Sequence, residues 1–86
     1  MTFTERYEAW RKETEETRMR TEIVREGKKY LVSTCNTFDQ GWETMVFPIM
    51  EDGEPLYNEQ ACKRYANQSD ATFGHVAMVQ DFQPNN

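Results

Sequence analysis

The sequence predicts a small α+β domain, an antiparallel meander of three to four strands with an N-terminal and a C-terminal helix packed on it. Three observations favour this fold: a capped, aromatic-striped segment opens the chain, β-rich runs joined by turn residues fill its middle, and a second helical stripe follows Ser69. At 86 residues the chain is expected to form one domain. We divide it into a helix over 1–20, a meander over 21–66 and a helix over 69–82.

Capping residues and aromatic spacing predict the first helix. Thr2 followed by Glu5 is a capping-box pair, which satisfies backbone N–H groups of the first turn. Three aromatic side chains then recur at i, i+4 and i+7 and so share one face. That face either packs in the core or a dimer interface, or binds a partner through large rigid rings. The candidate aromatic interface comprises these three residues and one tryptophan of the third strand: Phe3, Tyr7, Trp10 and Trp42.

The middle of the chain predicts a hairpin and a third strand. The runs 21–25 and 29–37 flank Gly27, which can take the positive φ of a tight turn. The run 42–50 carries apolar residues on both faces when it is read as a strand, so both faces need a cover. One helix covers one face, and the N-terminal helix or a second subunit is expected to cover the other. Pro48 lacks an N–H and is expected near a strand end, at a bulge or on an edge.

The last helix is predicted to begin at an N-cap, Ser69. Gly74 lies inside it and costs about 1 kcal/mol relative to alanine, so we expect it to admit a bulky neighbour. Helical spacing identifies the residues that should face the sheet. They are Ala71, His75, Met78, Val79 and Phe82.

No catalytic constellation is recognisable in the sequence. His75, the single histidine, lies on an apolar stripe and is expected to be a hydrogen-bonded core residue rather than a base or a ligand. Cys35 and Cys62 are too few for a disulfide scaffold and are expected to be packed thiols in a reducing cytosol. A zinc site with His75 is disfavoured, because it would require three separate elements to converge. We predict no cofactor, no metal and no enzymatic activity, with a small hydrolase using His75 and an acid as a minor alternative.

Charge is unevenly distributed along the chain. Residues 1–29 hold eight Lys/Arg and seven Asp/Glu, a net +1, whereas residues 30–86 hold two bases and eight acids, a net −6. Direct nucleic-acid binding is therefore disfavoured. Six acids follow one another without an intervening base, either as solvated loop residues or as a negative surface that meets a basic groove on another protein. They are Asp39, Glu43, Glu51, Asp52, Glu54 and Glu59.

No apolar run is long enough to span a membrane, and the N-terminus is too polar for a signal peptide, so we expect a cytoplasmic protein. Arg64 is one of two bases after residue 29 and is expected to pair with Glu43 across the sheet. Tyr65 and His75 are expected to pack or hydrogen-bond beneath the last helix.

The stretches "ETMVFP" and "RYANQSDATFGHVAMV" resemble a group of small proteins carried by phages, prophages and bacteria. The resemblance covers about residues 30–80. It implies a mobile-element context, in which small acidic proteins often bind and block host machinery, including CRISPR and other defence nucleases. The residues that carry the motif in the last third of the chain are Arg64, Tyr65, Gly74, His75 and Met78.

These observations together predict a non-enzymatic interaction protein. It would bind a host protein stoichiometrically, for instance a nucleic-acid-binding defence effector that it inhibits in the bacterial cytoplasm. The alternative is a structural or assembly module that forms a homodimer or joins a larger particle.

Overall fold

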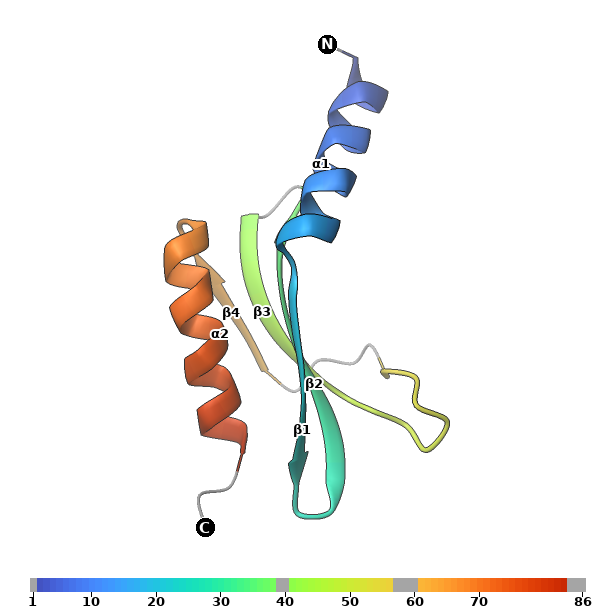
Figure 1. The fold of residues 1–86 in the computed structure, drawn as a ribbon, viewed down its shortest axis with the longest axis vertical. Helices are drawn as coiled ribbons and strands as arrows, with labels where there is room; N and C mark the ends of the chain where they lie inside the picture. Colours follow the sequence, from blue (N-terminus) through green and yellow to red (C-terminus); the bar gives the residue numbers. More distant parts are fainter. Residues whose placement is uncertain (1, 39–40, 57–60, 84–86) are drawn as a thin grey trace.

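A computed structural model shows the predicted α+β fold, with a helix at each end of a four-stranded antiparallel meander in the order β1-β2-β3-β4 (Figure 1). The structure describes residues 2–38, 41–56 and 61–83. The elements in chain order are α1 (Phe3–Thr17), β1 (Met19–Arg25), β2 (Lys28–Thr37), β3 (Gly41–Pro48), β4 (Ala61–Tyr65) and α2 (Gln68–Phe82).

The N-terminal helix is capped as predicted but ends earlier than predicted. The Thr2 hydroxyl accepts a hydrogen bond from the Glu5 backbone N–H at 3.2 Å. The helix ends at Thr17 rather than at residue 20, because Arg18 takes an extended backbone conformation. The chain then enters β1 at Met19, which pairs with Thr34 of β2. Met19 and Arg20, which we predicted to belong to the helix, therefore pair with β2 as part of β1.

The β1–β2 hairpin closes through a two-residue turn. Glu26 and Gly27 both have positive φ, 54° and 78°, which is the conformation that matches the twist of paired strands. Directly opposed residues of antiparallel strands share a face. The register thus gives the sheet an α2 face and a second face. The α2 face carries Thr21, Ile23, Val32, Thr34, Thr44 and Val46, and the second face carries Arg20, Glu22, Leu31, Cys35, Glu43 and Phe47.

α2 lies along one side of the sheet and closes the core (Figure 1). Ile23, Val32 and Val46 form the buried centre. The predicted stripe of α2 faces them: two of its residues are buried and three are packed against the centre, namely Ala71, His75, Met78, Val79 and Phe82. The predicted N-cap at Ser69 is wrong. Asn67 caps the helix instead, its side-chain oxygen accepting from the Asp70 N–H at 2.8 Å.

The second face is covered differently from the expectation. α1 reaches only β2 and extends past the end of the sheet (Figure 1), so it does not cover this face. Leu31 and Phe47 are nevertheless buried there. The segment 49–56 closes on itself through the bridge between Ile49 and Pro55, and it lines one hollow together with Leu31 of this face. The described part of the chain that lies beside this face is thus a short irregular segment rather than a helix.

Pro48 is the last residue of β3, as its missing N–H requires. Its carbonyl accepts from the Leu56 N–H at 2.8 Å, and the next residue, Ile49, donates its N–H to the Lys29 carbonyl at 2.9 Å. The predicted strand 42–50 therefore stops two residues early as a regular strand.

Candidate functional site

His75 lies at the centre of a hydrogen-bonded threonine network. Its Nε2 is 2.8 Å from the Thr21 hydroxyl and its Nδ1 is 2.7 Å from the Thr34 hydroxyl. Thr34 is in turn 2.5 Å from the Thr44 hydroxyl, so one histidine ties α2 to β1, β2 and β3. Burial lowers the pKa of His75 below its ordinary value. The prediction of a hydrogen-bonded core histidine is confirmed, and both ring nitrogens are committed to holding the fold together.

Gly74 brings α2 against β4. A Cβ built at this position would collide with the phenol ring of Tyr65, which fills the space beside the helix. The expectation that this glycine admits a bulky neighbour is confirmed. Tyr65 also lies opposite Trp42 in the β3–β4 ladder. Trp42 is buried on the α2 face of the sheet, so it does not contribute to an exposed aromatic surface as Phe3 and Tyr7 do.

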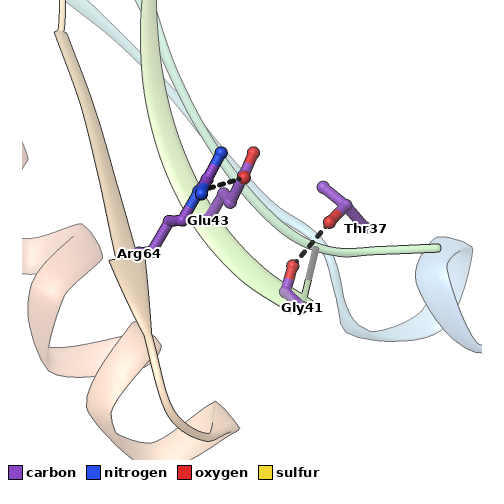
Figure 2. Close-up of polar contacts among 4 residues, drawn as sticks. All are labelled: Thr37, Gly41, Glu43 and Arg64. Atoms are coloured by element: carbon purple, nitrogen blue, oxygen red, sulfur yellow. Dashed lines mark hydrogen bonds and ion pairs between the residues drawn. The ribbon is translucent and has the colours of Figure 1, made fainter. Parts of the chain in front are cut away.

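The predicted pair between Glu43 and Arg64 is present across β3 and β4. Arg64 Nε donates to Glu43 Oε1 at 2.8 Å, and the two residues are directly opposed in the ladder (Figure 2). The carboxylate side chain is 8% exposed, whereas the guanidinium side chain is 63% exposed. Glu43 is thus not part of an exposed acidic surface, because its neighbours shield it from water.

The end of the sheet beside this pair is fastened by a second contact. The Thr37 hydroxyl donates to the Gly41 carbonyl at 2.8 Å, which joins the last residue of β2 to the first of β3 (Figure 2). Gly41 takes a positive φ of 79°, a conformation that side chains rarely adopt.

The two cysteines lie in different environments. Cys35 is half-buried and lies opposite Glu43 on the second face. Burial raises the pKa of Cys35, Glu43 raises it further, and Arg20 and Arg18 act in the opposite direction. Cys62 is exposed, so the prediction of two packed thiols is correct only for Cys35.

The acidic surface is confined to one turn in the part of the chain that the structure describes. Glu51, Asp52 and Glu54 are exposed there. The turn is well formed, since the Asp52 carboxylate accepts from the Glu54 N–H at 3.0 Å and Gly53 takes a φ of 88°. It lies on the side of the sheet away from α2 (Figure 1). Asp39 and Glu59, which we also predicted for this surface, lie outside the described residues.

The aromatic stripe of α1 gathers around a residue that the sequence did not identify, Phe38. The ring centroids of Phe3, Tyr7 and Trp10 lie 5.4, 5.5 and 5.5 Å from that of Phe38, in edge-to-face arrangements. We call these four residues the aromatic cluster. The Trp10 indole N–H and the Thr14 hydroxyl donate to the Asn36 carbonyl, which fastens α1 to the end of β2.

Much of the aromatic cluster remains in contact with solvent. Phe3 is 68% exposed, and Tyr7 and Phe38 also count among the exposed large hydrophobic residues. The contacts that partly bury Trp10 therefore orient the helix without enclosing its other rings. Sequence reasoning missed Phe38 because a loop residue has no periodicity, although an aromatic residue between polar neighbours is a usable signal.

Within residues 2–38, 41–56 and 61–83, no three side chains of His, Cys, Asp or Glu converge as metal ligands. None of the described helices has the length and apolarity needed to cross a membrane. No protein-family model matches the chain, no curated protein is significantly similar to it, and no solved structure matches it. The geometry defines an α+β meander. Within it His75, Glu43 and Tyr65 make contacts between elements of the fold.

Proposed function

We propose that this protein acts by binding another protein stoichiometrically, through the aromatic cluster of α1 and the acidic turn at residues 51–54. The observation that carries the proposal is the exposed ring of Phe3 on a helix that stands beyond the sheet. Large rigid rings contribute much of the binding energy of interfaces because they bury area at little entropic cost. The motif histidine, committed to Thr21 and Thr34, instead has a structural role.

The acidic turn supplies a second contact of defined charge. It presents three carboxylates in succession without a base among residues 50–56, and the chain carries a net charge of −5. Such a turn is complementary to the basic groove of a nucleic-acid-binding protein. We therefore favour a partner with such a groove, and the resemblance to small phage-carried proteins narrows this proposal to a host nuclease of the defence type, which the protein would inhibit by occupying the surface that binds nucleic acid.

A second function is favoured by the same rings. If the aromatic cluster of one copy packs on that of another, the protein is an assembly module and the cluster is a homodimer interface. The two functions differ in what the rings contact, so one substitution distinguishes them.

Capture experiments with matched variants test the proposal. The chain offers two exposed phenylalanines for comparison, Phe3 on α1 at 68% exposure and Phe73 on α2 at 76% exposure. Phe3→Ala should weaken capture of a bacterial partner at least tenfold, whereas Phe73→Ala should leave it unchanged. Equal effects of the two substitutions would contradict a role for the aromatic cluster. Loss of self-association in Phe3→Ala, without loss of a partner, would favour the assembly module.

The electrostatic contact is tested separately. The triple variant Glu51→Gln, Asp52→Asn, Glu54→Gln should weaken binding to the captured partner and reduce the salt dependence of its Kd. A control with the same change in net charge replaces Glu15, Glu16 and Asp81, which are exposed on the two helices. An unchanged Kd for the triple variant at moderate salt would show that the turn is only solvated. Inhibition of nucleic-acid cleavage by the purified partner then tests the nuclease assignment.

A further inference from the structure

The outer edge of β1 is an open strand edge. In the order β1-β2-β3-β4, β1 has a strand neighbour on one side only. Among the described strands β1 is paired with β2 alone, and Figure 1 shows α2 to one side of β1 and α1 continuing beyond its N-terminal end. Such an edge offers a row of backbone donors and acceptors to another strand.

The hairpin fixes which residues of β1 direct their backbone groups outward. A two-residue turn makes its flanking pair, Arg25 and Lys28, a hydrogen-bonded pair. Alternate residues of β1 therefore bond to β2, and the residues between them point away from the sheet. The Lys29 carbonyl accepts from the Ile49 N–H and so points away from β1. Lys29 is opposite Val24, which agrees with Val24 not being hydrogen-bonded to β2. The outward-pointing residues of β1 are Arg20, Glu22 and Val24.

Only some registers let this edge pair with a copy of itself. A twofold axis perpendicular to the sheet must oppose outward-pointing residues with outward-pointing residues. An axis through Thr21 places Arg20 of each copy opposite Glu22 of the other. An axis through Glu22 or Arg20 instead opposes two like charges, which is unfavourable across strands. An axis through Ile23 no longer places Arg20 opposite Glu22, so both Arg20–Glu22 pairs are lost.

We propose that two copies of the chain pair antiparallel through their β1 edges about an axis at Thr21, so that the sheet continues from one copy into the other. Backbone hydrogen bonds supply the affinity, and the two Arg20–Glu22 pairs select the register. On the α2 face the same register brings Met19 beside Ile23 of the other copy, which extends the apolar core. The inference does not depend on the proposed function. It places the two aromatic clusters at opposite ends of the dimer, where each is free to bind.

A charge-exchange experiment tests this register. Both positions are exposed, so substitution leaves the core untouched. Arg20→Glu and Glu22→Arg each oppose like charges in both pairs and should be monomeric in sedimentation equilibrium at concentrations where the unaltered protein is a dimer. An equimolar mixture of the two variants should form a heterodimer, and the double variant Arg20→Glu, Glu22→Arg should form a homodimer again. Lys12→Glu and Glu16→Arg on α1 are the matched controls and should leave the dimer intact.

A backbone variant tests the edge together with the charge pairs, because it removes both an outward-pointing N–H and the Glu22 carboxylate. Glu22→Pro removes an outward-pointing N–H that β2 does not use, so it should give a monomer with its fold retained by circular dichroism. A monomeric unaltered protein would overturn the proposal and show that the β1 charges protect the edge from pairing. A dimer that survives both charge reversals, or one that is lost in Phe3→Ala, would also overturn it, the latter in favour of the aromatic cluster.

Discussion

The ring of Tyr65 on β4 occupies the space in which a side chain at Gly74 of α2 would lie. β4 is a five-residue edge strand, and this contact is one way in which it is held against the helix. The absence of a side chain at residue 74 therefore matters for packing rather than for backbone conformation, because Gly74 has ordinary helical geometry.

Gly74→Ala should destabilise the protein although alanine is the better helix former. Helix propensity alone would stabilise the variant by about 1 kcal/mol, but displacing a packed ring from a filled space typically costs about 1–3 kcal/mol. We expect a net loss in the free energy of unfolding by urea. In a Tyr65→Ala background, the same substitution should be neutral or stabilising. An equal effect of Gly74→Ala in both backgrounds would contradict the contact.

Arg64→Gln should destabilise the sheet by leaving the Glu43 carboxylate without its cationic partner. Loss of one partner from a fully buried pair costs about 3–5 kcal/mol, but Arg64 is largely in water, so we expect about 1–2 kcal/mol after discounting for screening. Glu43→Gln in the same chain should recover part of the loss, because an uncharged amide is less costly to bury. Additive effects of the two substitutions in chemical denaturation would show that the pair is not coupled.

Stability should fall as the pH drops below the ordinary pKa of histidine. Burial lowers the pKa of His75 in the folded protein from its ordinary 6.5, so the unfolded chain binds the proton more readily. The contribution of neutral His75 is complete above pH 6.5 and is lost as the pH falls from there towards the folded-state pKa.

His75→Gln tests this pH dependence, because glutamine does not titrate. The difference in unfolding free energy between the unaltered chain and the variant should shrink between about pH 7.5 and about pH 5. Carboxylates titrate in both chains and cancel in the difference. A difference that stays constant with pH would show that the pKa of His75 is not lowered by folding.

The two thiols should react with iodoacetamide at different rates. Cys62 is exposed, whereas Cys35 is half-buried with a pKa raised by burial and by Glu43. Because the thiolate is the reactive form, peptide mapping by mass spectrometry should find Cys62 alkylated first. Glu43→Gln should speed the reaction of Cys35, since it removes one cause of the raised pKa. Equal rates in the native protein would contradict the assigned environments.

The elements most readily predicted from the sequence are those with local signals. Capping at Thr2, the turn at Gly27 and the spacing of the α2 stripe are local, and the structure confirms each. The pair of Arg64 with Glu43 was also predictable. Few bases follow residue 29, and a Glu43 carboxylate placed in a strand needs a cationic partner on the neighbouring strand.

Features that depend on distant segments were not predictable in the same way. Apolar alternation in β3 shows that both faces need a cover, but it does not say that the segment 49–56, rather than a helix, lies beside the second face. The boundary of α1 was misplaced because Arg18 suits a helix as well as an extended chain, and pairing of Met19 with Thr34 decides it. Phe38 joins the aromatic cluster from a loop, across a separation that no periodic pattern spans.

Hydrogen exchange of the isolated protein tests the account most directly. It asks whether the sheet and α2 form a protected core while α1 stays accessible to solvent. The amides of Val46 and Phe47, in the middle of the sheet and buried, should exchange slowly. Those of α1, which has no buried residue and packs on β2 and the adjoining Phe38, should exchange much faster. Rapid deuterium uptake at Val46 and Phe47, or protection of α1 equal to that of β3, would contradict this account.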